Sequence, residues 1–587
     1  MHMLLLFPLL APVPPLQAAP ADGRAPILDQ RKLRQAMTRL QSEHPDLVNL
    51  LSVGTSRSGE KIEALRIASG EAWQGRPAIL VVANLDGPMV YTSGIALEHA
   101  SSLVARYATD PAVKQLLDGT TLYVVPRANP DGAAARFSTP LVEVSATGHG
   151  VDNDRDARAG EDGWTDIDGD GRILHMRVPD PEGRWTEDPT DPRVLIEADP
   201  LKGQVGRWKL VPEGRDTDGD GEASEDPPLD AVVNRNFPYL WEEHAPESGL
   251  FPTDEPEARA LCDFVLARTD IQVVVVYGEL DNLAKPPTSV DDDAPDAERV
   301  PPVGVRKSDS ELIAEIGRRY AENVEQRAEG FGKAEGSFQS WCYAERGLIV
   351  LSITPWAIPL EGAGEGDTEG EEVDGTAGAE DSNDSSQAAL GDTDKGARGK
   401  KDGAPQPSDD AKRMKWIEAQ TDAERFVAWA PFEHPELGPV EIGGFAPYAR
   451  IEPPPADRIR IADEQLGFLL AVGDMLARIE LADVWAADLG GGVWEVEASL
   501  ENRRLLPLRT TWGRRTETVR PAKVRLRLPP DAKLLAGPRV ELVDDLPGSG
   551  GRRTLRWLVR GAEPRAIGIS VETDNAGAAQ AVPEVKP

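Results

Sequence analysis

Residues 78–83 read AILVVA and continue directly into the stretch NLDGPM of residues 84–89. Six consecutive apolar residues that end in a turn are typical of a strand buried on both faces of a sheet. Similar apolar runs occur at residues 121–126, 271–277 and 348–353, and they alternate with helical stretches such as 93–107 and 257–267. This alternation predicts an α/β fold in which a mixed sheet is flanked by helices.

The domain organisation follows from changes in composition along the 587 residues. A chain of this length exceeds one hydrophobic core, so two or three units are expected. Residues 361–412 are Gly, Asp, Glu and Ser with hardly an aliphatic residue, which predicts a disordered acidic insert. Short alternating strands at 482–575 predict a C-terminal all-β sandwich. The α/β domain is then assigned to residues 28–360, with acidic loops at 150–230, and 413–481, and residues 576–587 to a disordered tail.

The formal net charge of −36 narrows the classes of partner. Such a surface repels nucleic acid and anionic membranes and favours cations. No segment beyond the N-terminus is long and apolar enough for a membrane helix, so we expect no membrane span and a soluble mature protein.

Residues 1–21 have the pattern of a signal peptide. A short apolar run at residues 4–13 is followed by small residues up to Ala21, where cleavage is expected. The protein is therefore predicted to be secreted, periplasmic or attached to the cell envelope. The alternative is an ordinary cytosolic N-terminus, because the first residues lack Lys and Arg.

Five short motifs occur in a particular order. They are GTSRSGEKI at 54–62, VVANLDGPM at 81–89, PRANPDG at 126–132, NRNFPY at 234–239 and EPEARAL at 255–261. In this order and spacing they resemble the zinc carboxypeptidases of the carboxypeptidase A type, over about residues 30–480 apart from the acidic insert. The resemblance implies a carboxypeptidase-like mixed sheet, a catalytic zinc ion and peptide substrates.

The resemblance also implies positions for the zinc ligands, and the expected residues are absent from them. The family's His-x-x-Glu falls on Asp86 and Met89, the later His on Tyr277, and the general-base Glu on Thr354. A thioether and a phenol are poor zinc ligands, and a hydroxyl cannot take a proton from water at neutral pH. Zinc is thus expected from the family, but its ligands are missing.

Asn234 and Arg235 match the pair that grips the substrate's terminal carboxylate in the family. Arg suits this role because its planar fork donates two parallel hydrogen bonds to a carboxylate. The alternative is a structural role in which Arg235 pairs with an internal acid such as Glu255 or Glu257.

Three loops carry Asp on alternate residues, the pattern of dockerin or thrombospondin calcium loops. Carboxylates at this spacing, with Gly where the chain turns sharply, supply the oxygen ligands of calcium. Calcium is expected as a stabiliser, and solvated acidic loops are the alternative. The candidate ligands are Asp152, Asp154, Asp156, Asp166, Asp168, Asp170, Asp216, Asp218 and Asp220.

Three functions remain open. The first is a carboxypeptidase-like protein without zinc or peptidase activity, a binding or scaffold protein for peptide C-termini or cell-wall fragments. The second is an active metallocarboxypeptidase with an atypical metal site or a different ligand alignment. The third is a structural cell-envelope protein whose β-sandwich makes the contacts.

Overall fold

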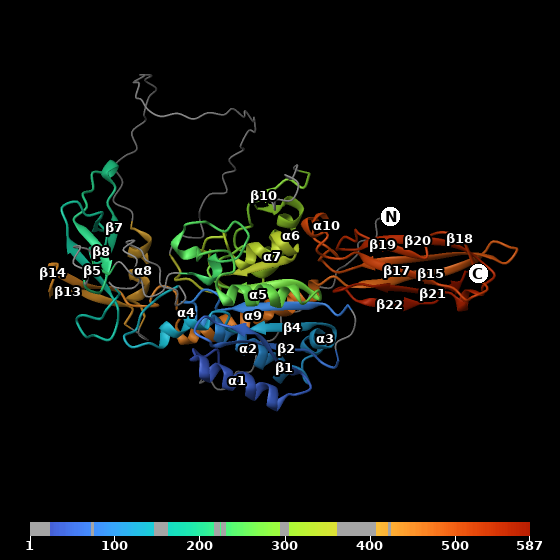
Figure 1. Ribbon diagram of the computed structural model, residues 1–587, viewed down its shortest axis with the longest axis horizontal. Coiled ribbons are helices and arrows are strands. Elements are labelled where there is room, and N and C mark those ends of the chain that lie inside the picture. Colours follow the sequence, from blue (N-terminus) through green and yellow to red (C-terminus); the bar gives the residue numbers. More distant parts are fainter. Residues whose placement is uncertain are drawn as a thin grey trace, which may run out of the picture. The chain divides into compact units, whose positions relative to one another are not determined.

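The computed structural model describes residues 24–71, 75–145, 163–216, 223–224, 231–293, 304–360, 407–420 and 424–586. The chain forms two compact units (Figure 1). The first contains Met1–Gly163, Glu225–Ala357 and Ile451–Pro587, and the second contains Trp164–Ser224 and Ile358–Arg450. No helix of the described ranges has the length and apolar character needed to cross a membrane.

A six-stranded mixed sheet lies at the centre of the first unit, as the sequence predicted. Its order is β1-β2-β4-β3-β9-β12, in which β4, β3, β9 and β12 are parallel and β1 and β2 antiparallel. The bounds are β1 Val48–Thr55, β2 Lys61–Ile67, β3 Ala78–Ala83, β4 Thr121–Val125, β9 Ile271–Tyr277 and β12 Ile349–Ile353. Every residue of β3, β4, β9 and β12 is buried, which explains their unbroken apolar runs.

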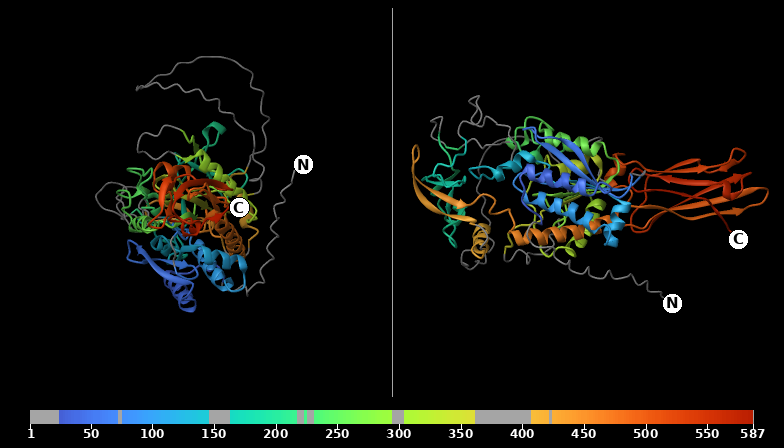
Figure 2. Two further views of the ribbon diagram at one scale, coloured as in Figure 1. Left: turned by 90° about the vertical axis from the view of Figure 1, so that its right-hand side faces the viewer. Right: turned by 90° about the horizontal axis from the view of Figure 1, so that it is seen from below.

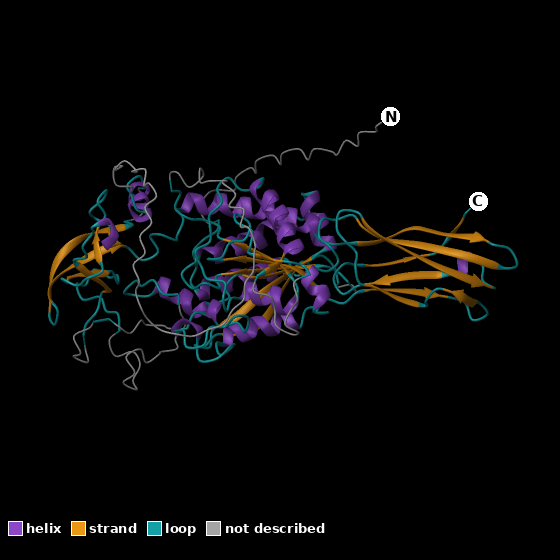
Figure 3. Ribbon diagram, turned by 90° about the horizontal axis from the view of Figure 1, so that it is seen from above, coloured by secondary structure: helices purple, strands orange, loops and turns teal. Residues whose placement is uncertain are grey.

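Helices cover both faces of this sheet (Figure 3). On one face, Leu80, Val82, Val274 and Val276 belong to a core that includes residues of α5 and α7. On the other face α2 packs against β3 and α9 against α2. The helices of this domain are α1 Gln30–Glu43, α2 Tyr91–Arg106, α3 Pro111–Gly119, α4 Pro130–Ala134, α5 Pro256–Leu266, α6 Lys307–Ala321, α7 Phe338–Arg346 and α9 Pro455–Met475.

The C-terminal part of the first unit is a β-sandwich (right-hand view of Figure 2). Its two sheets have the orders β18-β20-β16-β15-β23 and β19-β17-β21-β22. The strands are β15 Ile479–Asp488, β16 Val493–Asn502, β17 Ala522–Arg527, β18 Lys533–Ala536, β19 Val540–Val543, β20 Gly551–Arg560, β21 Gly568–Glu572, β22 Ala578–Ala581 and β23 Glu584–Val585. The predicted disordered tail therefore extends the sandwich instead, because β22 pairs with β21 and β23 with β15.

The short helix α10, Thr511–Arg515, attaches the sandwich to the α/β domain. The indole of Trp512 donates a hydrogen bond to the carbonyl of Ala344 at 2.7 Å. The buried carboxyl of Asp309 on α6 accepts the backbone N–H groups of Thr511 and Trp512. These buried contacts join two parts of the chain that are about 170 to 200 residues apart.

In its described residues the second unit has a six-stranded antiparallel sheet and one α-helix, and the sequence did not predict it. The strand order is β13-β14-β5-β8-β6-β7. The bounds are β5 His175–Pro179, β6 Trp185–Glu187, β7 Leu195–Glu197, β8 Trp208–Pro212, α8 Asp409–Ile417, β13 Phe426–His434 and β14 Gly438–Phe445. The predicted acidic insert ends earlier than residue 412, because Ser408 caps α8. Residues 361–406 lie outside the described residues.

Candidate functional site

Asp86 lies at the edge of the α/β sheet where the parallel strands end. It follows β3, and parallel strands bring the ends of β9 and β12 to the same edge. One carboxylate oxygen accepts a hydrogen bond from the side-chain amide of Asn234 at 2.9 Å, and the other accepts the backbone N–H of Glu279 at 2.9 Å. The residue is only 3% exposed, so both oxygens are occupied inside the protein.

Gly278 is the residue at the end of β9 that faces Asp86. A Cβ added at Gly278 would lie 2.2 Å from Oδ2 of Asp86, so a side chain there requires Asp86 to move. Thr354, which follows β12 and is 1% exposed, donates its hydroxyl to the carbonyl of Gly278 at 3.0 Å. The structure thus brings Asp86, Asn234 and Thr354 together around the backbone of residues 278–279.

Tyr277 points away from this group. Its ring meets that of His99 on α2 edge-on, with 5.7 Å between the ring centroids. Successive side chains of a strand point to opposite faces. The position that faces Asp86, which was predicted to be Tyr277, is therefore Gly278, one residue later. Met89 is 1% exposed, and its backbone N–H donates to the carbonyl of Asp86 at 3.1 Å.

Carboxyl groups gather at this edge. Burial raises the pKa of Asp86, and hydrogen bonds from Glu279 and Asn234 offset only part of that effect. Burial and the negative charges of Asp86 and Glu143 raise the pKa of Glu279. Burial also raises the pKa of Asp281 to about 6. These groups hold protons more readily than exposed acids do, so the site can donate hydrogen bonds as well as accept them.

Sequence reasoning did not identify Glu279 or Asp281. The available signal was their position directly after the buried strand β9, since side chains at the carboxyl ends of parallel strands converge on one edge.

Arg235 is a buried arginine held by exposed acids. Its side chain is 7% exposed and forms an ion pair with Glu242, whose side chain is 47% exposed. Its guanidinium also donates to the backbone carbonyl of Glu335 at 2.8 Å. The carboxylates of Glu335 and Glu247 lie 3.7 and 3.9 Å from the guanidinium. The neighbouring Asn234 accepts the backbone N–H of Phe338 at 3.0 Å while it donates to Asp86.

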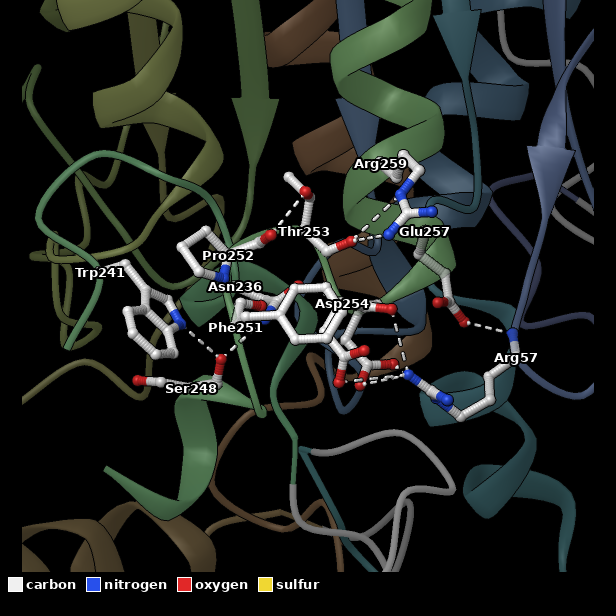
Figure 4. Close-up of polar contacts among 11 residues, drawn as sticks. Arg57, Asn236, Trp241, Ser248, Phe251, Pro252, Thr253, Asp254, Glu257 and Arg259 are labelled. Carbon is white, nitrogen blue, oxygen red and sulfur yellow. Dashed lines mark hydrogen bonds and ion pairs between the residues drawn. The ribbon is translucent and has the colours of Figure 1, made fainter. Parts of the chain in front are cut away.

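Glu255 and Glu257, suggested from the sequence as partners of Arg235, contact Arg57 instead. Figure 4 shows the contact between Arg57 and Glu257. The guanidinium of Arg57 donates to both oxygens of Glu255 at 3.1 and 3.0 Å. The backbone N–H of Arg57 donates to Glu257 at 3.1 Å. Both glutamates are 0% exposed, and burial raises the pKa of Glu257 to about 7.

The second unit holds part of the predicted calcium ligand set. Asp166 accepts the backbone N–H groups of Gly169, Asp170 and Gly171, which fixes a tight loop. Within the described parts of the chain, one group of three acids offers oxygens that all lie within 4.8 Å of one another: Asp166, Asp168 and Glu213.

Glu213 is buried and was not identified from the sequence. It accepts backbone N–H groups of Ile167, Asp168 and Leu174, and burial raises its pKa to about 7. Asp170 and Asp216 are described but do not belong to this group. The remaining predicted ligands lie outside the described residues; they are Asp152, Asp154, Asp156, Asp218 and Asp220.

Two protein-family models match the chain, one over the α/β domain and one over the β-sandwich. A family model described as zinc carboxypeptidase matches residues 33–168 and 219–368. A second model, for a domain family of unknown function, matches residues 478–582, which is the β-sandwich.

Curated relatives match a short part of the chain. A zinc carboxypeptidase of Saccharothrix mutabilis subsp. capreolus is 30% identical over 109 residues, which is 18% of this chain and 24% of that protein. Carboxypeptidase A1 of Bos taurus is 30% identical over 131 residues, 21% of this chain and 31% of that protein. The chain thus spans only about a quarter to a third of the length of these relatives.

Among solved structures, carboxypeptidase A from Helicoverpa armigera is 14% identical with a TM-score of 0.35, covering 57% of this chain and 66% of that one. A metallo-carboxypeptidase from Burkholderia cenocepacia is 12% identical with a TM-score of 0.29, covering 55% of this chain and 60% of that one.

Proposed function

Because the chain belongs to the zinc carboxypeptidase family, we propose that it keeps the family's fold as a binding or scaffold protein and does not hydrolyse peptides through a zinc ion. Its ligands in this proposal are peptide C-termini or cell-wall fragments that end in a carboxylate.

The proposal rests on the hydrogen bonds of Asp86, which engage both of its carboxylate oxygens. A catalytic zinc site needs three protein ligands, typically imidazoles and a carboxylate, and an open position for water. At this edge the two carboxylate oxygens of Asp86 accept hydrogen bonds from the side chain of Asn234 and from the backbone of Glu279. Gly278 has no side chain that could bind a metal ion. The described residues at this edge therefore do not fit a catalytic zinc ion.

The general base is also replaced. The hydroxyl of Thr354 donates to a backbone carbonyl, so its proton is engaged in a structural hydrogen bond. A hydroxyl has no basicity at neutral pH with which to activate water.

The proposed ligand contact is Arg235. A buried guanidinium that already binds a glutamate carboxylate has the chemistry to bind a peptide carboxylate, since the two groups are alike. Glu242, Glu247 and Glu335 have side chains that are 39–47% exposed, so each can move into solvent when a ligand carboxylate replaces it. Competition with these acids predicts weak binding that strengthens when one of them is neutralised.

A titration with matched peptides tests this proposal. The probes are acetyl-Ala-Ala-Phe with a free C-terminus and the same peptide with a C-terminal amide, measured by calorimetry. We expect the free acid to bind more tightly, Arg235→Ala to abolish the difference, and Glu242→Gln to increase the affinity several-fold. Arg39→Ala, which removes an equal charge at an exposed site, is the control.

Other outcomes identify the alternatives. Hydrolysis of the free-acid peptide that depends on added metal indicates an active metallocarboxypeptidase with an atypical site. Equal, weak binding of both peptides to every variant indicates a structural protein without a ligand at this site.

Calcium binding is proposed for the second unit on the convergence of Asp166, Asp168 and Glu213. Carboxylate oxygens are the ligands that calcium prefers. The proposed role is to stabilise the unit by offsetting repulsion among the acids, and thermal unfolding with and without calcium tests it.

Secretion through the predicted signal peptide also remains a proposal, since residues 1–23 lie outside the described residues. Export of the full-length gene product with an N-terminus near residue 22 supports it, and an intact N-terminus in the cytosol contradicts it.

A further inference from the structure

The β-sandwich differs in charge from the rest of the chain. Residues 482–587 contain 17 Lys+Arg and 14 Asp+Glu, whereas residues 1–481 contain 47 and 86. A basic module on a strongly acidic protein is suited to an acidic partner, because opposite charge accelerates encounter and selects the surface that binds.

Among the residues that the structure describes, strand β19 is an open edge of the four-stranded sheet. Its one neighbour among them is β17, in the antiparallel register Val540 to Arg525 and Leu542 to Lys523. The N–H of Leu526 donates to the carbonyl of Arg539 at 2.9 Å. Because backbone direction alternates along an antiparallel strand, Glu541 and Val543 then face β17, while Val540 and Leu542 direct their N–H and C=O groups outward.

The side chains beside this edge are apolar and then basic. Val540 is 47% exposed and Leu542 is 57% exposed, which is unusual for large apolar residues on an edge strand. On the same face of the neighbouring strand lie Lys523, Arg525 and Arg527, since cross-strand partners share a face and residues two apart do as well.

The edge of the other sheet shows what a protected edge looks like in this protein. Strand β18 begins with Lys533, and its pairing with β20 is interrupted by a bulge between Leu534 and Ala536. Lysine and bulges are the usual devices that prevent strand addition. Strand β19 has neither a Lys nor a Pro, and its pairing with β17 is regular throughout.

We infer that β19 is a docking edge for a partner protein, which adds an extended segment of alternating acidic and apolar residues to the four-stranded sheet. The outward N–H and C=O groups of Val540 and Leu542 supply the backbone hydrogen bonds of the added strand. Because successive side chains of a strand alternate between faces, the acidic side chains of the partner lie on the face of Val540 and Leu542 and reach the cations of β17, while its apolar side chains lie on the opposite face, that of Val543.

The charge on β17 decides between this partner and a second copy of the chain. Two copies joined edge to edge through β19 would place two sets of these cations on one continuous face, where each set of three meets one acid, Glu572, which pairs with Arg525 at 3.1 Å. An acidic segment neutralises them instead. The edge offers only four residues, so the contact is small and the affinity for a short peptide is expected in the micromolar range.

The test uses the full chain and two acetylated, amidated peptides, Glu-Val-Glu-Val-Glu-Val and Lys-Val-Lys-Val-Lys-Val, measured by fluorescence anisotropy at low and high salt. We expect the acidic peptide to bind at least tenfold more tightly, and the difference to shrink at high salt. A version of the acidic peptide with alternate N-methyl groups should lose binding, because it cannot complete the backbone ladder.

Variants locate the site. Leu542→Pro removes one outward N–H and should reduce binding at least tenfold, while Leu535→Pro on β18 should leave it unchanged. Circular dichroism checks that both variants fold. If Leu542→Pro does not fold, the double variant Lys523→Glu with Arg527→Glu decides the matter, since it should reverse the preference between the peptides.

The proposal is overturned by equal affinity for the two peptides, by binding of neither, by acidic-peptide binding that a folded Leu542→Pro leaves intact, or by wild-type dimers that Leu542→Pro dissociates.

Discussion

Arg57 and Arg235 are both paired with glutamates, but burial is distributed in opposite ways. At Arg57 the acid is inside: the side chain of Glu255 is fully buried, while the arginine side chain is 27% exposed. At Arg235 the arginine is inside, at 7% exposed, and its partner Glu242 is 47% exposed. A buried acid cannot exchange its partner, whereas exposed acids can leave a buried arginine. The first pair is a structural lock, and the second is a replaceable contact.

The largest expected effect comes from breaking the lock. Arg57→Ala removes the guanidinium from the buried carboxylate of Glu255, and breaking a buried ion pair costs about 3 kcal/mol or more. Urea denaturation should show this loss, whereas Arg39→Ala in an exposed pair should change stability by less than about 0.5 kcal/mol. Equal effects of the two substitutions would contradict the assignment of Arg57 as a lock.

Glu257 differs from Glu255 because it is a buried acid that accepts the backbone N–H of Arg57 and not its guanidinium. Burial raises its pKa from 4.5 to about 7. Below pH 4.5 the folded and unfolded states both hold the proton. As pH rises to about 7 the unfolded state ionises first, so stability falls over this window and the penalty is complete above it.

Glu257→Gln removes this ionisation. We expect the variant to gain stability at pH 8, on the order of 3 kcal/mol, and little at pH 4.5. Denaturation of both proteins across this pH range measures the difference. A gain that is independent of pH would show that ionisation of Glu257 is not its cause.

The sequence predicted the elements that depend on local pattern. The strands β3 and β9 were predicted with their observed bounds, because six or seven consecutive apolar residues are needed where both faces of a strand are buried. The same property made it impossible to predict from the sequence which way the side chain of Tyr277 points. In a strand that is apolar on both faces, no alternation marks which side chains point to α2 and which to Asp86.

The second unit was missed for a different reason. Its strands β6 and β7 are three residues long, and β5 pairs with β14, which lies more than 250 residues later. Such pairing leaves no local signal. The partners of Arg235 were also beyond sequence reasoning, since Glu242 and Glu335 are two of many acids in a chain with 100 Asp+Glu.

A smaller effect on stability is expected from calcium binding to the acids of the second unit. If calcium binds at Asp166, Asp168 and Glu213, calcium at ten times its dissociation constant should stabilise the second unit by about 1.4 kcal/mol. Differential scanning calorimetry with millimolar calcium and with EDTA measures it. Asp168→Asn should abolish the shift in unfolding temperature. No shift in the wild type would show that calcium does not bind this site.

The smallest effect on stability is expected at the exposed partner of Arg235. Glu242→Gln should change the free energy of unfolding by less than about 0.5 kcal/mol, because Glu335 and Glu247 remain close to the guanidinium. Denaturation measures this value alongside the binding titration. A loss comparable with that of Arg57→Ala would make Arg235 a second lock and remove its proposed role in ligand binding.

The zinc content per chain decides whether the edge of the sheet at Asp86 holds a catalytic metal. The full chain is stripped with EDTA, dialysed against excess zinc and then against metal-free buffer, and analysed by mass spectrometry for metal per chain, with Asp86→Ala beside it. We expect no stoichiometric zinc that depends on Asp86, since its carboxylate already accepts hydrogen bonds from Asn234 and from the backbone of Glu279. One tightly held zinc per chain that disappears in Asp86→Ala would contradict it.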